Sequence, residues 1–463
     1  MSNANILAAV SPLYYTSKVI GIAPISWPHR SRSPHLIKAY SLLVFISTLT
    51  CLIYSINWNV RNEYPSYTYT VIVPHIFKML LSFATVLAIS FLCGTVNGKK
   101  YEAILTKISA IDSILLGNAA TTNIIYRKMK IFVLVELLVI IPIYLILFCL
   151  DGAVWTGGVG DPHALVQYFV HLIGTVMDMQ FVNLVLLIKH RYALLNKQLI
   201  SLYKVPENEL EWTLLPIPEI LTNVLNTKKS SKNEMPVLNT VSYRTEYGFK
   251  NVKHFPGKKV DNTVKRKCEN TLTDLNMFPG GEKETISILN LQNVHSSLYD
   301  VAELVKSCYG IPILLELTFI VGSLIQSLYN VLLIALQLDK VETYAGPTEA
   351  MGLFLVWAIV RLIKMVCITT TCQTASSEAN RTAILVQKLL LTGGTRSKCL
   401  ERFSHQLLHY KLQFTTSGFF TLDSTLLYSL AGAVTTYLVI LLQFQFVASS
   451  ETNPNVTDTS SLA

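Results

Sequence analysis

Charged side chains lie inside long apolar stretches of this 463-residue chain. Charges at membrane depth are costly and mark functional sites. The residues concerned are Lys78, Glu136, Asp178, Glu316, Arg361 and Lys364. Gln167, His171 and Asp178 recur at i, i+4 and i+11, which places them on one helix face. Trp357 and Arg361 are likewise one turn apart.

These groups suit a polyhydroxylated ligand. Carboxylate, guanidinium, amide and imidazole groups pair with hydroxyls, and an aromatic plate packs the C–H side of a sugar ring. We expect the ligand-binding set to be His75, Lys78, Tyr144, Gln167, His171, Asp178, Gln326, Tyr329, Asn330, Trp357 and Arg361. The alternative is an ion pair between Asp178 and Arg361 that only joins two helices.

Other chemistry has weaker support in the sequence. Glu401, His405 and His409 are spaced like metal ligands on a helix, but no further ligand cluster completes a site. None of the eight cysteines forms a CxxC pair. A P-loop, a nucleophile elbow, a zincin motif and a dinucleotide fingerprint are all missing. We therefore expect no enzyme activity, no metal and no cofactor.

The composition indicates a membrane protein with several spans. Hydrophobic residues make up 51% of the chain and charged residues 14%, where a soluble chain has about 25% charged residues. This excludes an ordinary soluble enzyme, a disordered protein and a secreted disulfide scaffold. Stretches of about 20 apolar residues can cross a bilayer, and seven qualify or nearly qualify: 36–56, 70–93, 131–150, 164–188, 310–337, 350–372 and 424–447.

Basic residues predict the orientation of these spans. Outside the long segment 189–309, the loops on one side hold fifteen Lys and Arg and those on the other hold two. Because cytoplasmic loops are enriched in Lys and Arg, the N-terminus is expected inside and the C-terminus outside. This disfavours a G-protein-coupled receptor, which has the opposite orientation. It also explains the net charge of +9 without nucleic acid.

The orientation fixes a domain plan for an all-α polytopic membrane protein of seven transmembrane helices. The expected parts are 1–35, a cytoplasmic segment; 36–200, helices 1–4 of a ligand-binding bundle; 201–290, a largely disordered cytoplasmic loop; 291–372, helices 5–6; 373–423, cytoplasmic anchor helices; 424–447, a pore-lining helix 7; and 448–463, an extracellular tail. Amphipathic patterns flanking the spans, including ERFSHQLLHYKLQF, predict a cytoplasmic helical bundle. Asn455 is then an external glycosylation sequon, whereas Asn380 lies inside.

The last span carries a narrow polar stripe. Thr436, Ile440 and Gln443 share one face, and symmetry-related copies around an axis would satisfy its polar groups and form a pore. Eight acidic residues against two basic ones in the external loops would concentrate cations there, although ordinary loop charge explains them equally well.

Residues 436–444, TYLVILLQF, match in full the TYhhhhhQF signature of insect gustatory receptors. The segments YYTSKVIGIAPI and CYGIPILLELTFIVGSLIQSLYNVLL also resemble that family, in particular its fructose-receptor subgroup. The resemblance implies a homotetrameric, ligand-gated cation channel with an outer ligand pocket and a pore lined by the last helix. The implied pore and gate residues are Thr436, Ile440, Gln443, Phe444 and Val447.

The expected function is therefore a gustatory receptor acting as a sugar-gated, non-selective cation channel in the plasma membrane, with fructose as the first candidate ligand. The same channel gated by inositol or another polyol is the alternative, and a secondary transporter of a small polar solute is a further one. The expected partners are the small-molecule ligand, monovalent cations with divalent cations as a further candidate, further copies of the chain in a homotetramer, and membrane lipid.

Overall fold

A computed structural model describes residues 2–22, 34–63, 69–116, 119–158, 162–202, 281–337, 345–392 and 398–451. The chain divides into two compact units. One comprises residues 1–197 and 290–463. The other, 198–289, is described only at its two ends, which are helical. Most of the expected loop 201–290, most of the tail 448–463 and the sequon at Asn455 lie outside the described residues.

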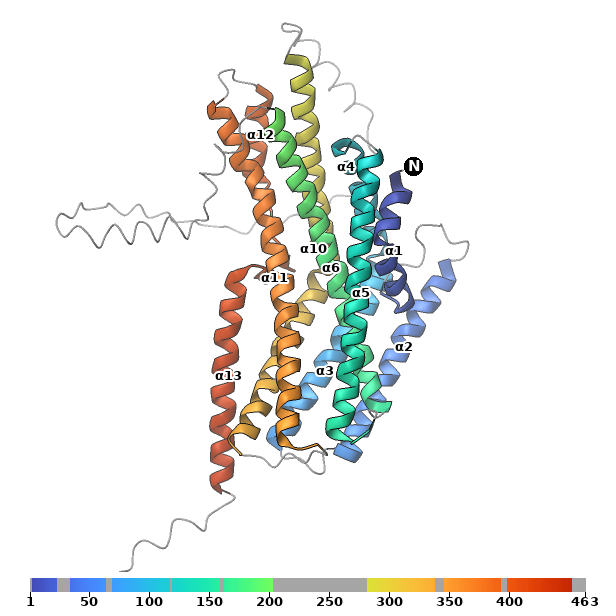
Figure 1. Ribbon diagram of the computed structural model, residues 1–463, viewed down its shortest axis with the longest axis vertical. Coiled ribbons are helices and arrows are strands. Elements are labelled where there is room, and N and C mark those ends of the chain that lie inside the picture. The colour runs from blue at the N-terminus through green and yellow to red at the C-terminus, as the bar shows by residue number, and fades with distance from the viewer. Residues whose placement is uncertain are drawn as a thin grey trace, which may run out of the picture. The chain divides into compact units, whose positions relative to one another are not determined.

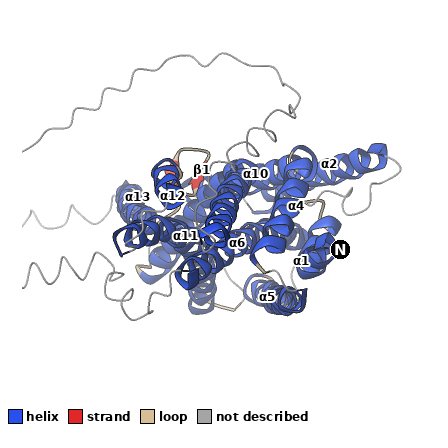
Figure 2. Cartoon of the chain, turned by 90° about the horizontal axis from the view of Figure 1, so that it is seen from above, coloured by secondary structure: helices blue, strands red, loops and turns tan. Residues whose placement is uncertain are grey.

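Helices make up nearly all of the described chain (Figure 2). In order they are α1 (Ser2–Val19), α2 (Pro34–Trp58), the π-helix η1 (Asn59–Glu63), α3 (Tyr69–Phe91), the π-helix η3 (Leu92–Val96), α4 (Gly98–Leu115), α5 (Ala119–Trp155), α6 (Pro162–Leu202), α10 (Gly281–Ala335), α11 (Pro347–Thr392), α12 (Lys398–His409) and α13 (Ser424–Glu451). The strands β1 (Thr415–Thr416) and β2 (Phe420–Thr421) form the one antiparallel pair in the described residues.

Among the described residues, six stretches are long and apolar enough to cross a membrane: Leu42–Arg61, Asn123–Trp155, Leu165–Leu202, Ile286–Ala335, Pro347–Leu391 and Ser424–Val447. The expected second span falls on α3, whose apolar stretch His75–Phe91 is shorter. Helix α10 has 55 residues, about 80 Å at ~1.5 Å per residue. That exceeds a hydrocarbon core of about 30 Å, so α10 extends well beyond any membrane.

Helix packing in the larger unit follows the apolar patterns. Helix α1 lies against α4 and α5, α2 against α3, and α13 alongside α11 (Figure 1). Between α10, α11 and α13, a core cluster forms from Leu324, Ala358 and Val434. These contacts leave α13 attached along a single side.

A buried ion pair fastens α4 to α6. Arg191 donates from Nε to Oδ1 of Asp112 at 3.0 Å and from Nη2 to Oδ2 at 2.8 Å. The Tyr126 hydroxyl of α5 donates to the same carboxylate. A bidentate pair with a third hydrogen bond is the arrangement in which a buried charge is best compensated.

The chain between the last two helices departs from the expected helical pattern. The sequence predicts a helix through ERFSHQLLHYKLQF, but α12 ends at His409 and an extended segment follows. There Asn380 of α11 donates from Nδ2 to the carbonyl of Leu412 and accepts from the Leu412 amide. The Asn380 side chain thus supplies the hydrogen bonds that a helix would otherwise give to the Leu412 backbone. A β-hairpin follows and leads into α13.

Candidate ligand-binding site

Aromatic side chains from three helices gather around Trp357 of α11. Its ring centroid lies 6.3 Å from that of Tyr144 on α5, 5.5 Å from that of Tyr168 and 5.7 Å from that of His171, both on α6. Tyr144 and Tyr168 belong to a buried apolar cluster against which Trp357 packs. The structure thus brings together Tyr144, His171 and Trp357, which the sequence grouped only by depth.

Arg361 lies one helical turn from Trp357. Its guanidinium carbon is 4.8 Å from the Trp357 ring centroid and 5.9 Å from that of Phe319 on α10. Only 6% of the residue is exposed, and Nη1 donates a long hydrogen bond of 3.4 Å to the Trp357 carbonyl. Stacking on two rings stabilises the cation and orients its donors.

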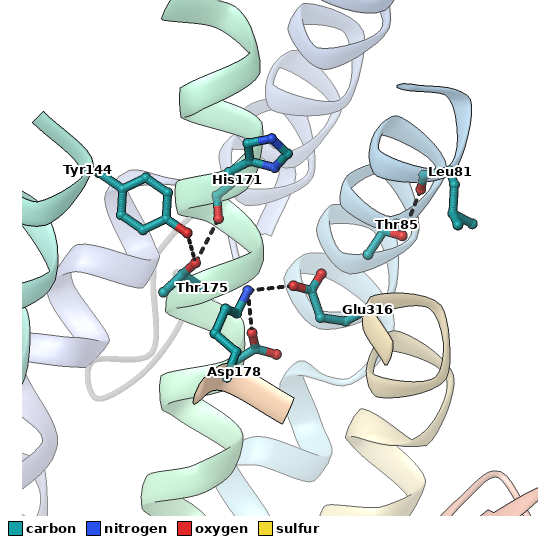
Figure 3. A network of polar contacts seen from close by, with 8 residues as sticks. Leu81, Thr85, Tyr144, His171, Thr175, Asp178 and Glu316 are labelled. Carbon is teal, nitrogen blue, oxygen red and sulfur yellow. Dashed lines mark hydrogen bonds and ion pairs between the residues drawn. The ribbon is translucent and has the colours of Figure 1, made fainter. Parts of the chain in front are cut away.

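The partner of Asp178 is Lys364, not Arg361. The Lys364 ammonium lies 2.8 Å from Oδ2 of Asp178 and 2.6 Å from Oε1 of Glu316 (Figure 3). The expected alternative, an Asp178–Arg361 ion pair, is therefore wrong. Arg361 and Lys364 share a face of α11, but the Arg361 guanidinium is held on the rings.

Next to this triad, a hydrogen-bonded group joins α5 to α6. Tyr144 and Thr175 share a hydrogen bond of 2.6 Å between their hydroxyls, and Thr175 also donates to the His171 carbonyl at 2.9 Å (Figure 3). Gly174 lets the Glu316 carboxylate approach closely, because an added Cβ would lie 2.9 Å from Oε2. A larger residue at this position would displace Glu316 from the triad.

Charge is balanced over the wider cluster. Asp151 accepts a hydrogen bond of 2.9 Å from the Tyr168 hydroxyl and interacts electrostatically with Lys78 and Arg361. His171 interacts electrostatically with Lys78, Arg361 and Lys364. Lys364, Asp178 and Glu316 form the triad described above. With the triad included, the cluster holds three carboxylates and three cations.

Of the three residues expected on α10, Tyr329 points away from Trp357. The Tyr329 hydroxyl donates to Oε1 of Gln445 on α13 at 3.3 Å. Gln326 is buried, and its Oε1 has no hydrogen-bond partner among the described residues. Asn330 is half-buried, as are His75 on α3 and Gln167 on α6. The structure thus places Tyr329 against α13 and not among the rings around Trp357.

Helix α13 presents a broad exposed face. That face includes all five expected pore residues: Thr436, Ile440, Gln443, Phe444 and Val447. Phe444 is 65% exposed. Thr436 bonds within its own helix, to the Gly432 carbonyl. Gln445, in contrast, is buried against α10 and is not among the residues expected from the sequence. Gln445 follows Gln443 by two residues, which places it on nearly the opposite side of the helix. Helical spacing therefore predicts that Gln445 faces the bundle when Gln443 does not.

Within the described parts of the chain, no group of three or more His, Cys, Asp or Glu side chains could hold a metal ion. Glu401 is half-buried, and His405 and His409 are exposed on α12.

Comparison with known proteins finds a family model described as "7tm Chemosensory receptor", which matches residues 10–208 and 254–447. Gustatory receptor 68a of Drosophila melanogaster is 33% identical over 22% of this chain and 26% of its own length. Putative gustatory receptor 28b is 33% identical over 29% of each chain, and putative gustatory receptor 2a is 26% identical over 35% of this chain and 42% of its own, both from the same organism. The matches thus span less than half the length of these relatives.

Solved structures with the same fold include the insect olfactory receptor OR5 from Machilis hrabei. The TM-score is 0.57 at 12% identity, over 96% of this chain and all of that one. A second structure of OR5, in complex with eugenol, gives 0.56 at 13% identity over the same shares.

Proposed function

The chain belongs to the 7tm chemosensory receptor family, and on that premise we propose that it is a gustatory receptor acting as a ligand-gated, non-selective cation channel in the plasma membrane. The observation that carries the proposal is the cluster of rings and charges around Trp357 and Arg361 inside a bundle of membrane-length helices. Buried charge at membrane depth is retained where it serves a function.

The topology belongs to the proposal. Seven helices cross the membrane, α3 being the second, with the N-terminus inside and the C-terminus outside. The positive-inside distribution of Lys and Arg supports this orientation. The cluster around Trp357 then lies in the outer half of the membrane, where a ligand from outside reaches it.

A sugar is the first candidate ligand, with fructose ahead, and inositol or another polyol is the alternative. Trp357 offers a ring face, and Arg361 and Asp178 offer a donor and an acceptor for hydroxyls. A secondary transporter is a further alternative. Transporters commonly contain internal repeats, and none is recognisable in this sequence.

The pore is proposed to form from α13 of each subunit in a homotetramer. Its exposed face carries Gln443 and Phe444, and a face with polar groups needs partners in lipid. Copies around an axis supply these partners. Ligand binding shifts the closed–open equilibrium only by its difference in affinity for the two states. In this scheme the open state moves Phe444 off the axis.

The test is expression of this chain alone, with currents recorded against a panel of sugars and polyols. We expect ligand-evoked cation current that Trp357→Ala abolishes, and Gln443→Ala or Phe444→Ala to alter closed or open current. Phe169→Ala is the matched control for Phe444→Ala, since both are exposed aromatic residues on membrane-length helices. Solute uptake without channel conductance would favour the transporter.

A further inference from the structure

Arg361 is a buried cation without an ion-pair partner in the described part of the chain. Only 6% of Arg361 is exposed. Its hydrogen bond to the Trp357 carbonyl is long, at 3.4 Å. A guanidinium has five N–H donors, so most of them have no protein partner here. Asp151 and Glu316 attract the guanidinium electrostatically, but in the described residues neither carboxylate forms an ion pair with it, so its charge is compensated only from a distance. Such a group favours a ligand with a negative charge.

The opposite imbalance lies beside it. In the triad, one ammonium faces the two carboxylates of Asp178 and Glu316. Oδ1 of Asp178 is buried and has no hydrogen-bond partner among the described residues. The triad therefore favours an additional positive charge with N–H donors.

The two imbalances are close together. Arg361 and Lys364 are three residues apart on α11, so their Cβ atoms lie roughly 5–6 Å apart. Asp178 is bound to Lys364. A cation without an ion-pair partner and a pair of carboxylates that share one ammonium thus start about one helical turn apart on α11, and the Arg361 guanidinium lies on the Trp357 ring.

The charge balance restricts the ligand further. Lys78, Arg361 and Lys364 stand against Asp151, Asp178 and Glu316 in this cluster. A ligand with net charge would leave one buried charge uncompensated, whereas a zwitterion would not. Charge-assisted hydrogen bonds are about twice as strong as neutral ones, which favours a zwitterion over a neutral sugar.

We propose that the preferred ligand of this site is a zwitterionic amino acid with an aromatic side chain. Its carboxylate pairs with the Arg361 guanidinium, its ammonium binds Asp178, and its ring packs among Trp357, Tyr144 and Tyr168. This inference rests on the proposed function in that it takes the cluster around Trp357 to be the ligand site, and it assigns that site a ligand class other than a sugar.

The test compares four probes on purified full chain in lipid nanodiscs, by ligand-induced shift of the melting temperature. L-phenylalanine carries both charges, L-phenylalaninamide lacks the carboxylate, N-acetyl-L-phenylalanine lacks the ammonium, and fructose is neutral. We expect L-phenylalanine to bind about tenfold or more tightly than each of the other three. Equal or tighter binding of any of them, or no binding of L-phenylalanine, overturns the proposal.

Variants assign each charge to its residue. Arg361→Gln is expected to remove the preference for L-phenylalanine over its amide, because it weakens binding of L-phenylalanine and does not weaken binding of the cationic amide. Asp178→Asn is expected to remove the preference over the N-acetyl compound. Arg127→Gln, at an exposed arginine of α5, is the control and keeps both preferences. If Asp178→Asn fails to fold, the probe comparison and Arg361→Gln still decide.

Recording currents with the same probes separates this inference from the channel proposal. Binding of L-phenylalanine that depends on Arg361 but evokes no current keeps the inference and refutes the channel. Current evoked by fructose, with no binding of L-phenylalanine, keeps the channel and refutes the inference.

Discussion

The hydroxyl of Tyr329 on α10 donates a hydrogen bond of 3.3 Å to the side-chain carbonyl of Gln445 on α13. Both side chains are buried, and α13 is otherwise largely exposed along its length. The bond lies beside Gln443 and Phe444, the proposed gate residues. It is therefore a specific polar attachment between the bundle and the outer part of the proposed pore helix.

Tyr329→Phe should release this attachment. The change removes one hydroxyl and leaves Gln445 with a buried carbonyl that lacks its donor, at a cost of about 1–3 kcal/mol. If the bond holds the closed position of α13, current without ligand rises severalfold in whole-cell recordings. Tyr428→Phe is the control, because Tyr428 lies on α13, the helix that the bond attaches, and is 79% exposed. Unchanged basal current in Tyr329→Phe would show that the bond does not bias gating.

Lys364→Met should destabilise the protein strongly. It leaves Asp178 and Glu316 buried without their cation, a type of change that costs about 3–5 kcal/mol. The readout is the melting temperature of the purified chain. Lys107→Met breaks the exposed ion pair with Asp300 and should cost about 0–1 kcal/mol. Neutralising all three members of the triad should recover much of the loss, and no recovery would contradict a role for charge imbalance.

Sequence spacing could group residues on one helix but could not tell which helices face each other. Trp357 and Arg361 were expected together, and they lie together because one turn separates them. Tyr329 was grouped with them by its depth, yet its direction on α10 points to α13. Depth along a span does not reveal rotation about the helix axis.

The choice between two cations on one face also lies beyond the sequence. Arg361 and Lys364 could each reach Asp178, and the structure selects Lys364 because Phe319 and Trp357 hold the Arg361 guanidinium. The end of α12 at His409 cannot be predicted from the local pattern for a similar reason. The side chain that pairs with Leu412, Asn380, is 32 residues away in the sequence.

Gly310→Ala should displace the hairpin that leads into α13. An added Cβ would lie 2.8 Å from Oγ of Ser417 and 3.0 Å from its backbone nitrogen, so the hydroxyl must rotate and the turn must move by a few tenths of an ångström. Overpacking of this kind costs about 1–3 kcal/mol. Gly352→Ala is the matched control, since nothing lies within 4 Å of its added Cβ and both glycines are helical.

The control Gly352→Ala should gain up to about 1 kcal/mol in stability from helix propensity, whereas Gly310→Ala should be less stable than the unmodified chain. We also expect Gly310→Ala to change the ligand concentration for half-maximal current. A melting temperature equal to that of Gly352→Ala would show that the hairpin accommodates the methyl group.

Asp423 caps the start of α13. Its Oδ1 accepts hydrogen bonds from the amides of Thr425 at 3.0 Å and Leu426 at 3.3 Å, and from the Thr425 hydroxyl. These bonds, the hydroxyl of Thr425 foremost, lower the pKa of Asp423. A carboxylate at a helix N-terminus is also stabilised by the helix dipole.

The sign of the pH effect follows from this. A pKa lowered by folding means that the cap stabilises the folded state above the unfolded carboxyl pKa, about 3.9, and that this contribution is lost as the pH falls through the lower folded pKa. Asp423→Ala should cost about 1 kcal/mol at neutral pH, measured as a melting temperature. Asp423→Asn keeps the acceptor and loses only the charge, so its deficit against the unmodified chain should shrink as the pH approaches about 3. A deficit that is the same at neutral and acidic pH would refute an ionised cap, because the two proteins differ only at residue 423, where the carboxylate titrates and the amide does not.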